Sequence, residues 1–110
     1  MPSESDSFAA AFREPPMAFR SFPLWVWNTD MQPEDLRRTL DQFHEQGLGG
    51  AFVHPRPGLV TEYLSDEWFA LWEQARVHSE SLGITLQVYD ENSYPSGMAG
   101  GHVYERNREP

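Results

Sequence analysis

Three short apolar runs alternate with two amphipathic helical segments, and this alternation limits the fold more than any other feature of the sequence. The runs are residues 22–27, 49–54 and 84–89, and the helical segments are residues 32–46 and 65–82. Strands that alternate with helices through short connections favour a parallel sheet with right-handed crossovers. The sequence therefore predicts an α/β fold in the order β-α-β-α-β, with a (β/α)8 barrel and a doubly wound sheet as the two candidate architectures.

The helical segments carry recognisable start and packing signals. Pro33 suits the first position of a helix, where a backbone N–H would have no partner. Leu36, Leu40 and Phe43 then recur at helical spacing and form one apolar stripe. Ser65 suits the N-cap of the second helix, since its hydroxyl can accept a hydrogen bond from the first turn.

The alternation of side chains along the apolar runs favours the barrel. Successive strand residues point to opposite faces, and each run has small aliphatic residues on one face and aromatic or polar residues on the other. In a barrel the aliphatic residues face the surrounding helices, and the other set fills the interior. The alternation therefore predicts Trp27, His54 and Glu91 on the interior face, each at the carboxyl end of its strand, where barrel enzymes carry their sites.

The chain divides into three parts. We expect a flexible leader over residues 1–21 whose later part packs on the body, a partial TIM-barrel domain over residues 22–103, and a polar tail over residues 104–110. No helix or strand is expected after residue 101. Three parallel strands with two helices leave both sheet edges open. We therefore expect the opening part of a larger barrel, which is unstable or aggregates as an isolated chain and is not active alone.

The composition excludes several functional classes. The formal net charge is -9 and the sequence has no lysine, so an acidic surface repels nucleic acids and anionic membranes. Without cysteine there is no disulfide, thiolate metal site or cysteine nucleophile. No apolar run approaches the ~18 residues that span a bilayer. No signal peptide is visible, so the compartment is unknown and the cytoplasm is the default expectation.

The predicted strand ends offer several candidate site residues. Glu91 follows an inward row of polar residues, and a carboxylate in that position indicates a functional role. Its neighbour Asp90 points away from the interior and suits a turn cap. His54 is either a satisfied loop histidine or a ligand-binding side chain. Arg56 is either a surface charge or a donor to carboxylates and hydroxyls.

Two further features have both a structural and a functional interpretation. Trp27 is either a side chain packed in the hydrophobic core or, beside Asn28, a surface on which the C–H face of a sugar ring stacks. Residues 96–101 are rich in glycine but match no phosphate-binding pattern, so turn chemistry fixed by Pro95 explains them. We interpret this segment as a rigid rim that shapes a site. The sequence has no zinc-ligand spacing and no nucleophilic-serine elbow.

Four segments together form a family pattern. They are residues 23–28 (P-L-W-V-W-N), residues 47–59 (G-L-G-G-A-F-V-H-P-R-P-G-L), residues 63–68 (Y-L-S-D-E-W) and residues 89–101 (Y-D-E-N-S-Y-P-S-G-M-A-G-G). In this order they resemble the start of the barrel domain in large bacterial glycoside hydrolases, of the α-L-rhamnosidase type (glycoside hydrolase family 106 and relatives). The resemblance covers roughly residues 19–103.

The resemblance implies hydrolysis of a glycosidic bond with inversion, by an acid and a base carboxylate about 6.5–9.5 Å apart. Glu91 is the best candidate for one of them, but a second must come from a strand outside this sequence, so the catalytic pair stays unassigned. The residues implied to bind the carbohydrate substrate are Trp27, Asn28, His54, Arg56, Asp90, Glu91 and Tyr94. No cofactor is expected, although the family implies calcium for some members; no D-x-D-x-D-G loop occurs here. The other implied partner is the remainder of the barrel.

Two alternative functions stay open. A metal-dependent barrel hydrolase or isomerase would use His54, Asp90 and Glu91 as ligands. A non-catalytic carbohydrate-binding remnant would bind sugar without turnover.

Overall fold

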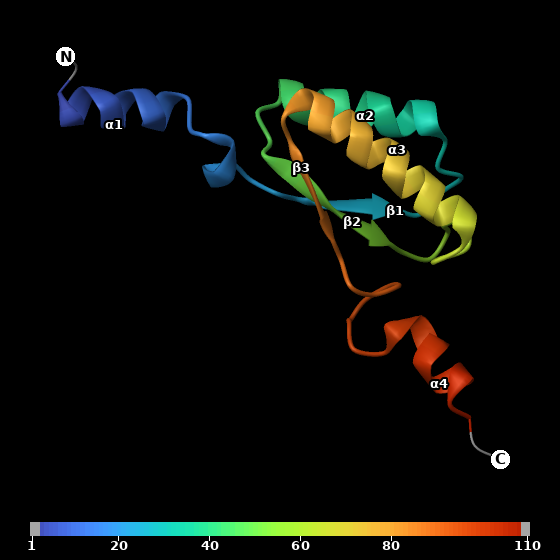
Figure 1. The fold of residues 1–110 in the computed structure, drawn as a ribbon. Helices are drawn as coiled ribbons and strands as arrows, with labels where there is room; N and C mark the ends of the chain where they lie inside the picture. Colours follow the sequence, from blue (N-terminus) through green and yellow to red (C-terminus); the bar gives the residue numbers. More distant parts are fainter. Residues whose placement is uncertain (1–2, 109–110) are drawn as a thin grey trace.

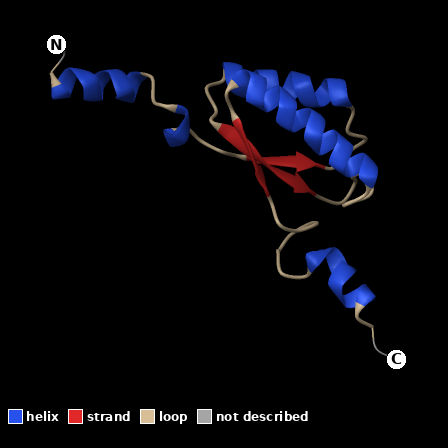
Figure 2. Cartoon of the chain, viewed as in Figure 1, coloured by secondary structure: helices blue, strands red, loops and turns tan. Residues whose placement is uncertain are grey.

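The computed structural model describes residues 3–108, and its central feature is a parallel sheet of three strands in the order β1-β2-β3. The strands are β1 (Leu24–Trp27), β2 (Gly50–Pro55) and β3 (Thr85–Val88). Helices α2 (Pro33–Glu45) and α3 (Asp66–Leu82) connect them, and both lie on the same face of the sheet (Figures 1 and 2). The predicted α/β class and the β-α-β-α-β order are confirmed.

The two connecting helices begin at the signals that the sequence carries, and glycine ends the second of them. Pro33 is the first residue of α2, and Gln32 precedes it in extended conformation. The hydroxyl of Ser65 accepts a hydrogen bond from the backbone N–H of Trp68 at 3.2 Å and caps α3. Gly83 ends α3 at a φ of 73°, in the left-handed region that glycine adopts without steric cost.

The core lies between the sheet and the two helices, and β1 contributes its tryptophans to it. Trp27 is 0% exposed and packs edge-on against Trp25 and against Trp68 of α3, with ring centroids 5.5 and 6.4 Å apart. Trp25 in turn meets Phe43 of α2. The same covered face carries Val53, which is paired in register with Trp25.

This packing corrects the predicted orientation of β1. The aliphatic residues of β2 and β3 face the helices as predicted, with Val53 and Leu86 in or against the core. In β1 the tryptophans take that place instead, and Leu24 is 53% exposed on the opposite face. The prediction that Trp27 lies on the same face as His54 is therefore wrong. The physical reason is that the helix layer buries the face it covers, and the largest apolar side chains of β1 gain most from that burial.

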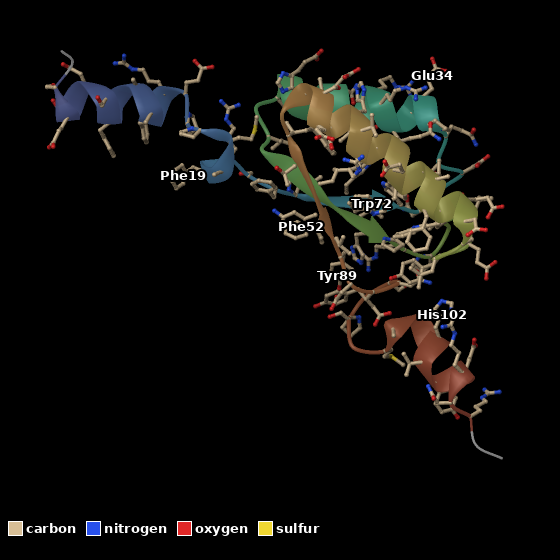
Figure 3. All side chains as sticks on the ribbon, viewed as in Figure 1. Phe19, Glu34, Phe52, Trp72, Tyr89 and His102 are labelled. Carbon is tan, nitrogen blue, oxygen red and sulfur yellow. The ribbon has the colours of Figure 1, made fainter. Side chains whose placement is uncertain are left out.

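The face opposite the helices is only partly covered. Figure 3 shows Phe52 and Tyr89 on that side of the sheet, away from α2 and α3. On the helix side, Val88 near the free edge of β3 is 66% exposed. Among residues 3–108, both β1 and β3 pair with β2 alone, so each keeps one open edge.

The ends of the chain contain helices that the sequence interpretation missed. Helix α1 (Glu4–Arg13) has a capping box formed by Ser3 and Asp6, and it projects away from the sheet without burying a residue (Figure 1). A 3-10 turn (Met17–Phe19) follows, and Met17 packs against the core, as expected for the later part of the leader. Flexibility of residues 1–21 stays a prediction, as do the domain boundaries.

The expectation of no element after residue 101 is wrong. A 3-10 turn (Ala99–Gly101) leads into helix α4 (His102–Arg106). Its five residues lack a side-chain cap and a wide apolar stripe, which explains why a periodicity argument does not find it. In the described part of the chain, no helix is long and apolar enough to cross a membrane.

Replacing Trp27 by alanine tests the role of the buried tryptophan. We expect a loss of about 3–5 kcal/mol in the free energy of unfolding, because the cavity cannot close between a sheet and two helices. The matched control Leu24→Ala, in the same strand but on the opposite face, should change it by less than about 1 kcal/mol. Urea unfolding followed by far-ultraviolet circular dichroism measures both, and equal losses from the two substitutions would contradict the packing.

Candidate functional site

The loops that leave the three strands lie side by side at the carboxyl edge of the sheet. The backbone N–H of Arg56 donates to the carbonyl of Trp27 at 3.0 Å, which ties the end of β2 to the end of β1. The N–H of Ser93 donates to the carbonyl of Pro55 at 2.8 Å, which ties the segment after β3 to β2. The edge is therefore one continuous surface, as the parallel arrangement predicts.

Gly58 makes a close approach of two of these loops possible. Its φ is 105°, and a Cβ at this position would lie 2.3 Å from the carbonyl oxygen of Asn28. A side chain here would push the two loops apart. Asn28 itself is exposed beside this contact.

A cavity of about 290 Å³ opens between the loop after β2 and the segment after β3. We call it the edge pocket. The residues that line it carry hydrogen-bond donors and acceptors: a guanidinium, a carboxylate, an amide and three hydroxyls. The lining residues are Arg56, Pro57, Gly58, Leu59, Thr61, Glu62, Tyr63, Asn92 and Ser93.

Glu91 is buried under the segment that follows it, with 1% of its surface exposed. Its two carboxylate oxygens accept five backbone hydrogen bonds. The donors are the N–H groups of Asn92 at 2.9 Å, Gly97 at 3.0 Å and Met98 at 2.7 Å, together with those of Ala99 and Gly100. The predicted orientation of Glu91 toward a barrel mouth is therefore wrong, because the side chain is enclosed by its own loop.

The loop can wrap around the carboxylate because several residues adopt positive φ. Gly97, Ala99 and Gly100 have φ values of 123°, 49° and 61°. Successive N–H groups then point inward and form an anion-binding nest. A Cβ at Gly100 would lie 3.1 Å from Cβ of Asn92, so this closure also needs a small residue.

The nest sets the ionisation of Glu91. Burial favours the neutral form and raises the pKa, but hydrogen bonds from the N–H groups of Asn92, Met98, Gly97 and Gly100 outweigh it. The net pKa of Glu91 lies below its ordinary value. The carboxylate is thus charged at neutral pH. Both of its oxygens accept hydrogen bonds from the loop, so neither is available for proton transfer or for binding a ligand.

His54 supports the edge pocket from beneath. It is 0% exposed, and its Nε2 lies 3.3 Å from the carbonyl oxygen of Ser93. Nε2–H is then the donor, and Nδ1 has no partner among the described residues. The imidazole also packs on the ring of Tyr89, with centroids 4.0 Å apart. His54 therefore holds the pocket wall and does not line the cavity.

Tyr63 forms the inner side of the edge pocket. Its ring packs edge-on against Trp68, with centroids 5.2 Å apart, and meets the ring of His102 at a tilt, with centroids 5.9 Å apart. Burial raises the pKa of the phenol, and the negative charges of Glu91 and Asp90 raise it further. The hydroxyl stays neutral and can donate a hydrogen bond.

The structure brings together only part of the predicted set. Arg56 lines the edge pocket, and Asn28 lies behind Gly58. Asp90 and Tyr94 are exposed and outside the lining. Trp27 is fully buried and offers no face to a ligand.

Five of the six polar residues that line the edge pocket were not predicted as site residues. Tyr63, Asn92 and Ser93 belong to the segments that carry the family resemblance, so the sequence contained a signal for them. Nothing in the sequence singled out Thr61 and Glu62, which reach the pocket through the path of the loop. The missed residues are Thr61, Glu62, Tyr63, Asn92 and Ser93.

The alternative metal site does not form among residues 3–108. No three His, Asp or Glu side chains come together there in a way that could hold an ion. The oxygens of Glu91 are taken by backbone N–H groups, so His54, Asp90 and Glu91 do not form a ligand set. Calcium stays a prediction from the resemblance alone.

A solved rhamnosidase structure is similar in fold. It comes from Novosphingobium sp. PP1Y and superposes with a TM-score of 0.66 at 22% sequence identity. The match covers 86% of this chain but only 9% of that chain. No family model matches the sequence, and no curated protein matches it either. The similarity shows a shared α/β fold with one small part of a glycoside hydrolase.

Acidification tests whether the loop N–H groups bind the ionised carboxylate of Glu91. Its pKa is lower in the folded than in the unfolded chain, so the stabilisation is present above the unfolded pKa and is lost as the pH falls through the folded pKa. We expect the amide protons of Gly97, Met98 and Gly100 to shift together in one transition below the ordinary glutamate pKa. Nuclear magnetic resonance across an acid titration measures this. A transition at or above the ordinary value would contradict the nest.

Proposed function

We propose that this chain forms the opening part of a (β/α)8 barrel in a glycoside hydrolase that acts on α-L-rhamnoside-type or related bonds. Its contribution is to bind the sugar at the carboxyl edge. The observation that carries the proposal is the edge pocket, where Arg56, Glu62 and Asn92 line one cavity. The fold similarity to a rhamnosidase supports the same substrate class.

The arrangement of the sheet favours a barrel over a doubly wound fold. The strands follow in the order β1-β2-β3, and both helices cover one face (Figure 1). Right-handed crossovers that continue in one direction keep every helix on the outer face, as in a barrel. A doubly wound sheet reverses direction and covers both faces. The face that carries Phe52 and Tyr89 is the interior in this proposal.

The chemistry of the edge pocket suits a neutral sugar. Sugar hydroxyls both donate and accept hydrogen bonds, and the pocket offers a guanidinium from Arg56, a carboxylate from Glu62 and an amide from Asn92. With a formal net charge of -9 and Glu62 in the wall, an anionic sugar is repelled. A deoxyhexose such as rhamnose carries no charge.

Binding without catalysis is the second candidate function, and one observation favours it for the isolated chain. Inversion needs two carboxylates about 6.5–9.5 Å apart around the bond. Glu62 is the one carboxylate in the described lining of the edge pocket, while Glu91 is held by its loop. We therefore assign the reacting pair to the rest of a barrel and expect this chain alone to release no product from an aryl α-L-rhamnoside.

Titration calorimetry with L-rhamnose tests the proposal. We expect a dissociation constant on the order of 1 mM for the wild-type chain. Arg56→Ala should weaken binding about tenfold, because a charged donor to a sugar hydroxyl is lost. The matched control Arg37→Ala removes an exposed arginine of α2 and should leave the affinity unchanged.

Two results would count against the proposal. Binding that is unaffected by Arg56→Ala would place the sugar elsewhere. An absence of binding to a wild-type chain that circular dichroism shows to be folded would remove the sugar-binding function. Tighter binding of galacturonate than of rhamnose would contradict the neutral substrate class.

A further inference from the structure

We infer that Glu91 is a positioning residue of the edge pocket: its buried carboxylate binds backbone N–H groups between residues 92 and 100 and thereby holds Asn92 in the pocket wall. The expected effect of Glu91 on sugar binding rests on the proposed function. The expected effect of Glu91 on the loop is independent of that function.

Both oxygens of Glu91 take part in the arrangement. Oε1 accepts from the N–H of Asn92, at the start of the loop, and from that of Gly100, at its end. Oε2 accepts from the N–H groups of Gly97, Met98 and Ala99. One side chain therefore closes a ring of backbone, and Asn92 is at once a member of that ring and a lining residue of the edge pocket.

Few other contacts fix this loop. Beyond Glu91, Ser93 is tied to β2 through Pro55 and His54, and the N–H of Gly101 donates to the carbonyl of Met98 at 2.9 Å. Strand β3 has already ended at Val88. Without the carboxylate, the four N–H groups of residues 97–100 lose the acceptor that the structure gives them. A buried amide without an acceptor is unfavourable, so the loop is expected to open toward water when the carboxylate is removed.

The neighbouring carboxylate does not share this role. Asp90 is exposed and accepts none of the loop amides. The two adjacent acids of the sequence therefore differ in function, and Asp90→Asn provides a matched control with the same change of charge.

The direct test substitutes Glu91 and supplies a replacement anion. Glu91→Gln keeps the size but turns one acceptor into an NH2 donor that faces backbone donors. Glu91→Ala empties the nest, which formate can then enter. We expect both substitutions to shift the amide protons of Gly97 and Gly100 and to weaken L-rhamnose binding about tenfold. Formate should restore both properties in Glu91→Ala and neither in Glu91→Gln.

The controls separate the possible failures. Asp90→Asn should leave the amide protons of Gly97 and Gly100 in place. If the amide protons move but rhamnose does not bind even to the wild-type chain, the proposed function fails and the loop-holding role of Glu91 stands. If they do not move in Glu91→Gln, or if formate restores nothing in Glu91→Ala, the inference is overturned.

If both substitutions prevent folding, a measurement on the wild-type chain tests the inference. A scalar coupling across the hydrogen bond, from the amide nitrogen of Met98 to the side-chain carboxyl carbon of Glu91, reports the contact directly. Its presence supports the inference, and its absence overturns it.

Discussion

The burial of Trp27 between the sheet and α3 is the constraint on which the rest of the structure depends. Its ring contacts Trp25 and Trp68 edge-on, an arrangement that aromatic quadrupoles favour. Because the tryptophans of β1 take the covered face, Leu24 and Val26 turn to the other side, and β1 pairs with β2 in the register Trp25↔Val53 and Val26↔His54. That register brings the carboxyl ends of the strands level. The loops that leave them can then meet in one surface.

The topology could be predicted from the sequence because local signals agreed with the global pattern. The apolar stripe of α2, the Ser65 cap and Gly83 each define an element without help from tertiary contacts. The orientation of β1 could not be predicted in the same way. Alternation shows which residues share a face, but not which face the helices cover, and both faces of β1 are apolar. Helix α1 carried a readable signal in its Ser3–Asp6 capping box, whereas α4 is too short to show a period.

The sequence pointed to the carboxyl edge, where the structure has a cavity lined by Arg56, but not to most of the residues that line it. Arg56 and the carboxyl edge followed from the sequence, since strand ends meet in a parallel sheet. The role of Glu91 did not, because its partners are backbone N–H groups whose direction depends on positive φ at Ala99 and the nearby glycines. A buried carboxylate at a strand end resembles a catalytic group in a sequence. In this chain it stabilises a loop, and the carboxylate that reaches the cavity is Glu62.

The carboxyl edge thus has a pocket lining and a set of residues that hold this lining in place. In the proposed function, Arg56, Asn92 and Ser93 offer polar groups to a neutral sugar, while Glu91 and His54 hold the backbone of the pocket wall. A crystal structure of the chain with L-rhamnose tests this division most directly. We predict the sugar in the edge pocket, in contact with Arg56, and the carboxylate of Glu91 still bound by the backbone of residues 97–100. A sugar hydroxyl bonded to the carboxylate of Glu91, or a sugar bound away from Arg56, would contradict the account.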